Sequence, residues 1–127
     1  MRIASFLAAL AALIATPAFA ENWQTLGTLD NGTIIGVDVE SVKTGNGYAS
    51  VDVAIGFPVA QNGVKALKNR LFYSCITGTF DTIRSEAYDA SGRMVATEEK
   101  SKMSELTMTP VNRGSPAEIV GRLVCSQ

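Results

Sequence analysis

The chain has 127 residues, of which 46% are hydrophobic, with 11 basic and 12 acidic side chains and a formal charge of −1. This length fits one domain, and the near-neutral charge excludes a strongly basic nucleic-acid-binding protein. The sequence contains no histidine, which excludes Ser-His-Asp and Cys-His catalysis, histidine-ligated zinc and a histidine-based pH switch.

The first 20 residues have the three parts of a secretory signal peptide. Arg2 gives a positive start, residues 3–15 form an uncharged apolar run, and small residues at Ala18 and Ala20 fit an A-x-A cleavage site. A membrane anchor is the alternative, but the run is shorter than the about 20 apolar residues of a spanning helix. We therefore expect cleavage after Ala20, no stable membrane insertion afterwards, and a periplasmic or secreted bacterial protein. The domain then occupies residues 21–127.

Apolar alternation, β-branched runs and intervening turn residues predict an antiparallel meander after the signal. The clearest run is 48–57, in which every second residue is apolar, as in a half-buried strand. Asn46-Gly47 is a favoured two-residue hairpin centre, and Pro58 is expected to end the strand. In chain order, the expected strands are 23–29, 33–39, 48–57, 64–77, 79–89 and 93–97.

A charged segment follows the expected sheet. Residues 98–102, EEKSK, are interpreted as a solvated loop. After this loop, Met103, Leu106 and Met108 are expected to return to the core.

The last element has the strongest sequence signature. Ser115 is predicted as the N-cap of a helix over residues 116–125, with Pro116 as its first residue and Glu118 as its third. In this arrangement the hydroxyl and the carboxylate satisfy free backbone amides, and the proline loses no hydrogen bond. An apolar stripe follows in the helix. Because so short a helix is marginal alone, we expect it to pack on the sheet.

The two cysteines after the signal are Cys75 and Cys125. In an exported protein such a pair is usually oxidised, and two cysteines allow one intramolecular bridge. Closing about 50 residues stabilises a fold by roughly 4 kcal/mol in the loop-entropy relation. A redox-active pair is the alternative, but catalytic cysteines usually lie close together as C-x-x-C. We therefore predict a structural disulfide, with Cys75 on the core side of its strand.

Few residues carry the patterns of reactive chemistry. The carboxylate pairs Asp38/Glu40 and Glu98/Glu99 are interpreted as surface residues rather than as acid–base catalysts. Neither a phosphate-binding glycine loop nor a calcium loop is recognisable. We therefore expect no enzymatic activity, cofactor or metal.

Lys65, Lys68 and Arg70 form a small basic cluster on one expected strand. They are the candidate contact for an acidic or carboxylate-bearing partner. The alternative is an edge strand whose positive charge protects it against aggregation.

A series of short motifs occurs in order along almost the whole expected mature chain. They are Asn22-Trp23, Leu26-Gly27, a V-D-x-x-S segment with Val37, Asp38, Ser41 and Val42, then Phe72-Tyr73-Ser74-Cys75, Tyr88-Asp89-x-x-Gly92, Pro110, Gly114-Ser115 and Val124-Cys125. In these motifs the sequence resembles the surface-adhesin protein E-like family of small exported bacterial proteins.

The resemblance implies an antiparallel sheet with a C-terminal helix attached by the disulfide. For some members from pathogens, it also implies adhesion to host matrix and serum proteins. Glu21, rather than a lipid-accepting cysteine, follows the expected cleavage site. The resemblance therefore implies export without implying a lipid anchor.

The sequence predicts an α+β fold, with an antiparallel meander of about six strands and one C-terminal helix packed on it and linked by the disulfide. We expect an exported, non-enzymatic binding protein with a protein or peptide partner, bound for example by strand addition at an open sheet edge. The competing hypothesis is a periplasmic small-molecule-binding or envelope-stress protein. A dry pocket above ~300 Å³ between sheet and helix, lined by Trp23, Phe57 and Ile119, would favour this hypothesis.

Overall fold

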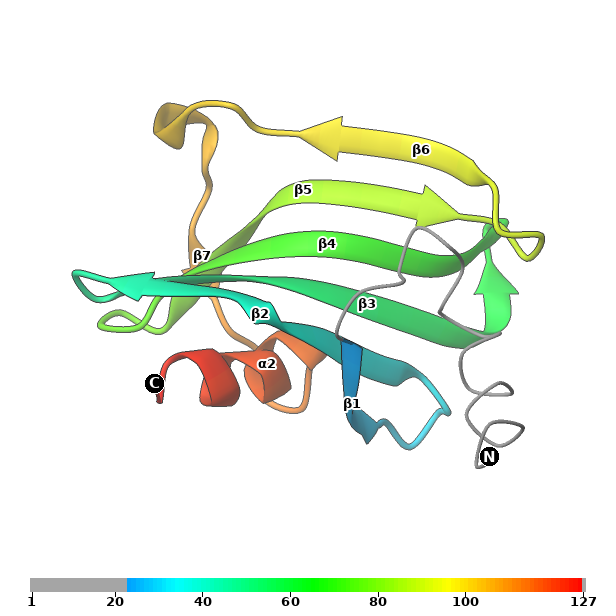
Figure 1. Cartoon of the computed structure of the whole chain (residues 1–127), viewed down its shortest axis with the longest axis horizontal. Coiled ribbons are helices and arrows are strands. Elements are labelled where there is room, and N and C mark those ends of the chain that lie inside the picture. Colours follow the sequence, from blue (N-terminus) through cyan, green and yellow to red (C-terminus); the bar gives the residue numbers. More distant parts are fainter. Residues whose placement is uncertain (1–22, 127) are drawn as a thin grey trace.

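The computed structural model describes residues 23–126, so the expected signal peptide and its cleavage site lie outside the described residues. An antiparallel sheet has the strand order β1-β2-β3-β4-β5-β6 (Figure 1). Its strands are β1 (Trp23–Thr28), β2 (Ile34–Gly45), β3 (Tyr48–Gln61), β4 (Val64–Ser74), β5 (Thr79–Tyr88) and β6 (Met94–Glu99). Each strand pairs with the next one along the chain, which confirms the predicted meander.

The segment after β6 returns along the sheet before the helix begins. It contains a 3-10 turn, η2 (Met103–Glu105), and a two-residue strand, β7 (Thr109–Pro110), which pairs with the start of β5. The helix α2 (Pro116–Val124) then lies against one face of the sheet (Figure 1). We call this face the helix face and the opposite one the polar face.

The hydrophobic core lies between α2 and the helix face. It is built from alternate residues of β2, β3 and β4 together with the apolar stripe of the helix, which confirms the predicted alternation. Its buried members are Ile35, Val37, Ala49, Val51, Val53, Leu71, Tyr73, Val120 and Val124. At its centre the hydroxyl of Tyr73 donates a hydrogen bond to the carbonyl of Ala117 at 2.7 Å.

The disulfide joins Cys75, directly after β4, to Cys125, the C-cap of α2, with a Cα–Cα distance of 5.5 Å. This confirms the predicted bridge. It fixes the C-terminal end of the helix to the sheet, while the Tyr73 hydrogen bond holds the first turn.

The start of α2 confirms most of the predicted cap. The hydroxyl of Ser115 accepts a hydrogen bond from the amide of Glu118 at 3.2 Å. The carboxylate of Glu118 accepts from the amide of Gly114 at 2.7 Å rather than from that of Ser115. The Ser115 amide already donates a hydrogen bond to the carbonyl of Asn112. The Glu118 carboxylate therefore accepts its hydrogen bond from the amide of the preceding residue, Gly114.

The predicted hairpin at Asn46-Gly47 is confirmed. Both residues have positive φ angles, 55° and 81°, as a type I′ turn requires. A Cβ on Gly47 would lie 2.6 Å from Cδ1 of Ile76, but Ile76 is 83% exposed and its side chain can move aside. The positive φ angle is therefore the reason that this turn needs glycine.

Four predicted strand ends are wrong by two residues or more. β2 continues to Gly45 instead of ending at residue 39, and β4 ends at Ser74 instead of continuing to residue 77. β3 continues through Pro58 to Gln61, because its pairing with β4 is interrupted between Gly56 and Gln61. A proline costs no ladder hydrogen bond where the ladder is already broken. β6 extends to Glu99, so the first charged residues of segment 98–102 belong to the sheet.

The return of the next apolar residues to the core is confirmed only in part. Leu106 and Met108 are half-buried, but Met103 is 66% exposed, because it begins the 3-10 turn at the outer end of the segment.

Candidate functional site

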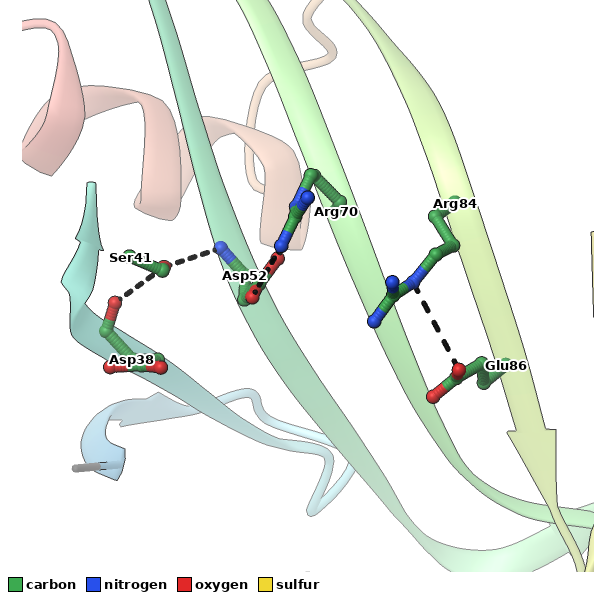
Figure 2. Close-up of polar contacts among 6 residues, drawn as sticks. All are labelled: Asp38, Ser41, Asp52, Arg70, Arg84 and Glu86. Carbon is green, nitrogen blue, oxygen red and sulfur yellow. Dashed lines mark hydrogen bonds and ion pairs between the residues drawn. The ribbon is translucent and has the colours of Figure 1, made fainter. Parts of the chain in front are cut away.

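Five charged residues form one row across the polar face. Asp38, Asp52, Arg70, Arg84 and Glu99 are successive cross-strand partners on β2, β3, β4, β5 and β6. Directly paired residues point to the same side of a sheet, and like charges facing each other are destabilising. The repulsion within the Asp38/Asp52 and Arg70/Arg84 pairs is offset in part by the Asp52–Arg70 and Arg84–Glu86 ion pairs drawn in Figure 2.

Asp52 and Arg70 form a two-point ion pair at the centre of this row (Figure 2). The Arg70 Nε lies 2.7 Å from Oδ1 of Asp52, and its Nη2 lies 3.1 Å from Oδ2. Asp52 is only 8% exposed, and Arg70 is the partner that a buried acidic side chain requires. The hydrogen bond to Asp52 in turn raises the pKa of Arg70, although partial burial opposes this.

Arg84 has a looser acidic neighbour on its own strand. Its Nε lies 3.9 Å from Oε2 of Glu86, which is an ion-pair distance rather than a hydrogen bond. The other oxygen of Glu86 accepts a hydrogen bond from the Tyr88 hydroxyl at 3.0 Å. Burial, and then this bond, raise the pKa of Tyr88 to about 12. The phenol is therefore protonated at neutral pH.

Beside the row, β2 carries an irregularity. Asp38 pairs with Asp52, whereas the next paired residue, Lys43, lies opposite Ser50. Four residues of β2, 39–42, therefore face a single residue of β3. This bulge leaves backbone groups of β3 without their regular ladder partners.

Ser41 supplies the missing partner (Figure 2). Its hydroxyl accepts a hydrogen bond from the amide of Asp52 at 2.7 Å and donates one to the carbonyl of Asp38 at 2.6 Å. The carboxylate of Asp38 accepts from the amide of Glu40 at 3.1 Å. The V-D-x-x-S motif is thus the sequence of a bulge that closes on itself. Its Asp38 is 8% exposed and not the surface residue that we expected.

We expect Ser41→Ala to lower the free energy of unfolding by about 1–3 kcal/mol, because the Asp52 amide loses its acceptor. Urea unfolding measures the change. Ser41→Thr, which keeps the hydroxyl, should recover most of the loss. Ser50→Ala on the neighbouring strand is the control and should change stability by less than about 0.5 kcal/mol. A Ser41→Ala loss no larger than that of the control would contradict this role.

Asp81 of β5 anchors the segment that follows β6. Its carboxylate accepts hydrogen bonds from Nζ of Lys100 at 2.7 Å and from the amides of Thr107 and Thr82, both at 2.8 Å. Burial opposes ionisation, but the bonds from Lys100 and the two amides outweigh it and lower the pKa of Asp81. Lys100 is therefore tethered to the sheet and not part of a freely solvated loop.

A lowered pKa in the folded state means that Asp81 adds stability above its unfolded pKa of about 3.9, and that this contribution disappears as the pH falls through the lower folded value. We expect Asp81→Asn to cost about 1–3 kcal/mol at pH 7 and progressively less below about pH 4. Urea unfolding between about pH 2 and pH 7 tests this. Asp30→Asn, in an exposed turn, is the control. A pH-independent difference between wild type and Asp81→Asn would be incompatible with this anchor.

The three predicted basic residues do not form one cluster. β4 places Lys68 and Arg70 on the polar face, whereas Lys65 falls on the helix face by alternation, and its Nζ donates to the carbonyl of Pro58 at 2.6 Å. β4 pairs with both β3 and β5, so its interpretation as a protected edge strand is wrong. A contact between these residues and a partner stays a prediction.

β6 forms an edge of the sheet on the side away from α2 (Figure 1). All its residues are exposed, and within residues 23–126 it pairs with β5 alone. The amide of Lys100 donates a hydrogen bond to the carbonyl of Ile83. This bond fixes which residues of β6 direct their backbone amides and carbonyls toward β5 and which direct them away. Thr97 and Glu99 therefore direct their amides and carbonyls away from β5. β6 presents a row of backbone groups that another chain can pair with.

The other edge strand, β1, is less suited to pairing. Its register with β2 shifts between Thr25 and Gly27, and such bulges turn an edge away from incoming strands. Val95 is likewise the extra residue of a bulge in β6, but the stretch from Ala96 to Glu99 keeps a regular register with β5. β6 is thus the more accessible edge.

The pocket that would favour the competing hypothesis is not present among residues 23–126 with the stated size and lining. Trp23 packs on the polar face against Ala54, Ala66 and Tyr88. An apolar pocket does lie between the sheet and the start of α2, but its volume is about 220 Å³, and Trp23, Phe57 and Ile119 do not line it. Neither the size nor the lining therefore gives the support that the competing hypothesis would have received from such a pocket.

Both buried carboxylates of the polar face already have hydrogen-bond partners. Asp52 is paired with Arg70, and Asp38 accepts a hydrogen bond from the amide of Glu40. Within residues 23–126, no three Asp, Glu, Cys or His side chains gather as metal ligands do. The same residues include no helix with the length and apolar character needed to cross a bilayer.

Comparison with known proteins agrees with the geometry. No curated protein sequence matches the chain significantly. A family model described as surface-adhesin protein E matches residues 23–126. The match includes the V-D-x-x-S bulge, both bridged cysteines and the capped helix. Because it spans most of the 127 residues, the chain belongs to the surface-adhesin protein E family.

Proposed function

We propose that this protein is an exported, non-enzymatic binding protein that recognises a protein or peptide partner through the edge of β6. Its family supports an adhesive role in general. The observation that carries the proposal is the open edge, in which Thr97 and Glu99 direct backbone groups away from β5.

In this mechanism an extended segment of the partner adds a strand beside β6. Main-chain hydrogen bonds supply much of the affinity, and side-chain contacts supply selectivity. Met94 and Val95 are 52% and 53% exposed, so they offer apolar contacts at one end of the strand. Glu98 and Glu99 offer negative charge at the other. The partner segment that fits best is apolar opposite the first pair and basic or polar opposite the second.

The proposal includes export, with the signal peptide removed after Ala20 and the mature protein periplasmic or secreted. Mass spectrometry of the exported protein should show Glu21 as its first residue, and an intact Met1 would overturn this part. Cell fractionation separates two roles: exposure at the surface supports adhesion to host proteins, and confinement to the periplasm supports binding of envelope proteins.

The decisive variant is Thr97→Pro. It removes an outward amide and obstructs an added strand, but it costs no hydrogen bond to β5. Thr97→Val, which keeps the amide, is the matched control. We expect Thr97→Pro to weaken partner binding at least about tenfold, equivalent to about 1.4 kcal/mol, and Thr97→Val to leave it within about twofold.

Partners are first captured from matrix-protein and envelope extracts, and each is then purified and titrated against the three proteins by biolayer interferometry. Thermal unfolding confirms that both variants remain folded. Equal binding by Thr97→Pro and Thr97→Val would exclude strand addition at β6. If no protein exceeds background in either extract, the proposed binding function fails.

A further inference from the structure

The open edge of β6 ends in two consecutive acidic residues that lie on opposite faces of the sheet. Glu99 is the cross-strand partner of Arg84 and ends the charged row on the polar face. Glu98 is the partner of Ser85, and alternation places it on the helix face. A strand that pairs with β6 therefore places one residue beside each carboxylate, and these two residues are consecutive in its sequence.

Neither carboxylate is bound to a basic side chain of its own chain. Within residues 23–126, Glu98 and Glu99 form no hydrogen bond or ion pair through their side chains. The acidic residues on the neighbouring strand β5 differ, because Glu86 lies 3.9 Å from Arg84 and Asp81 lies 2.7 Å from Lys100. The negative charge at the end of β6 is thus available to a partner.

A polar hollow lies beside Glu98. Its volume is about 320 Å³, and residues of β4, β5 and β6 line it together with Lys100. Lys100 is the one basic residue in this lining, and its Nζ already donates a hydrogen bond to Asp81. The hollow therefore keeps the negative charge of Glu98 and Glu99. The hydroxyl of Ser85, next to Glu98, adds an acceptor. These groups match the ammonium or guanidinium group of a long basic side chain, which is a donor and not an acceptor.

The sheet favours one direction for an added strand. Its paired strands are antiparallel throughout residues 23–126, and antiparallel pairing is slightly more stable per residue than parallel pairing. Thr97 and Glu99 direct their backbone groups outward, so each exchanges two hydrogen bonds with the residue opposite. Glu98 then belongs to the closer type of pair, with Cα atoms about 4.5 Å apart. An opposite charge facing Glu98 is therefore well placed to contribute to affinity.

We propose that β6 selects an antiparallel partner strand with two consecutive basic residues, one facing Glu99 on the polar face and the next facing Glu98 beside the hollow. The partner strand then continues toward the start of β6 and ends in apolar residues near Val95 and Met94, which are 53% and 52% exposed. This inference rests on the proposed strand addition at β6. It adds the charge, the direction and the register of the strand that is added.

Four peptides, blocked at both ends, test the sequence and the direction. TKKTTVVT has the proposed order, TQQTTVVT removes its charges, TEETTVVT reverses them, and TVVTTKKT has the same composition in reverse order. Each is titrated into the disulfide-bonded protein at low ionic strength, where surface charges are least screened, and followed by amide chemical shifts.

We expect TKKTTVVT to bind with a dissociation constant between about 100 μM and 3 mM. TQQTTVVT and TVVTTKKT should bind at least about threefold more weakly, and TEETTVVT at least about tenfold more weakly. The largest shifts should occur at Thr97, Glu98 and Glu99. A nitroxide label at the N-terminal end of TKKTTVVT should broaden the signal of Glu99 more than that of Met94, because an antiparallel strand begins beside Glu99.

Glu98→Gln/Glu99→Gln should bind TKKTTVVT and TEETTVVT within about twofold of each other. Asp30→Asn/Glu40→Gln is the matched control, because it removes the same charge from exposed residues at the opposite side of the sheet. This control should keep the tenfold preference.

The inference is overturned if no peptide binds, if the native protein shows no preference, or if both double variants keep it, because the attraction is then general. Stronger binding by TVVTTKKT than by TKKTTVVT would overturn the antiparallel direction. Thr97→Pro separates this inference from strand addition itself. If that variant weakens binding of a purified partner while the peptides show no preference, strand addition at β6 stands and the inferred sequence fails.

Discussion

Replacing both cysteines, as Cys75→Ala/Cys125→Ala, is expected to lower the free energy of unfolding by about 4 kcal/mol. The bridge spans 50 residues of sequence, and its loss restores the conformational freedom of that loop to the unfolded chain. A domain of this size is typically stable by about 5–15 kcal/mol, so the loss is a large share of the total. We expect a fall in melting temperature of about 15–30 °C.

The loss should appear first in the helix. α2 has nine residues, too few to be stable without tertiary contacts, and Cys125 at its C-cap is the covalent connection to the sheet. Hydrogen exchange of the last helical amides should therefore accelerate more than that of β3 and β4. Reduced wild-type protein is the matched control and should behave like the double variant. A stability loss below about 1 kcal/mol would show that packing alone holds the helix.

The second large effect is expected at Tyr73, whose side chain joins the helix to the middle of the sheet. Tyr73 is 2% exposed. Its ring stacks on that of Phe80 at a centroid distance of 5.7 Å. A Cβ added to Gly121 of the helix would lie 3.0 Å from the Tyr73 ring. Burial raises the pKa of Tyr73, so its hydroxyl keeps the proton that it donates to Ala117. We expect Tyr73→Ala to cost about 3–5 kcal/mol.

Tyr73→Phe separates the two contributions. It keeps the ring but leaves the Ala117 carbonyl without its hydrogen bond, so we expect a cost of about 1–2 kcal/mol. Tyr48→Ala is the control, because Tyr48 is 45% exposed and stacks on Phe72 at the surface. It should cost less than Tyr73→Phe in urea unfolding. Similar losses for Tyr73→Ala and Tyr48→Ala would contradict the central place of Tyr73 in the core.

Both effects concern the half of the domain that α2 covers, and the proposed binding edge lies elsewhere. α2 contacts β2 and β3 and, through Tyr73, β4, whereas β6 is the edge farthest from it in the sheet (Figure 1). The cysteine and Tyr73 variants should therefore lose stability without losing partner affinity at temperatures where they remain folded. Thr97→Pro should show the opposite behaviour. This contrast separates the stability of the fold from the function of its edge.

Local patterns in the sequence predicted the features that depend on neighbouring residues. Asn46-Gly47 specified a turn because few other pairs accept two positive φ angles. Ser115-Pro116 specified a helix start because a hydroxyl and a residue without an amide fit the first turn. Alternation in β3 placed Val51 and Asp52 on opposite faces because a strand has a period of two residues.

Several features of the candidate sites depend on pairing between distant segments, and these were not predicted. Alternation did not show that β4 is central and β6 an edge, since edge position is set by which strands pair. The burial of Asp38 follows from a bulge closed by Ser41 against the amide of Asp52.

The sequence alone therefore determined the turns, the alternation of the strands, the helix cap and the pair of bridged cysteines. Each of these follows from backbone angles, local hydrogen bonds or residue counts. The tertiary structure alone decided which edge is open, which charges are paired and where the pocket lies. These depend on contacts between residues far apart in the chain, such as Asp52 with Arg70 and Tyr73 with Ala117. A local sequence pattern does not indicate which distant residues come into contact.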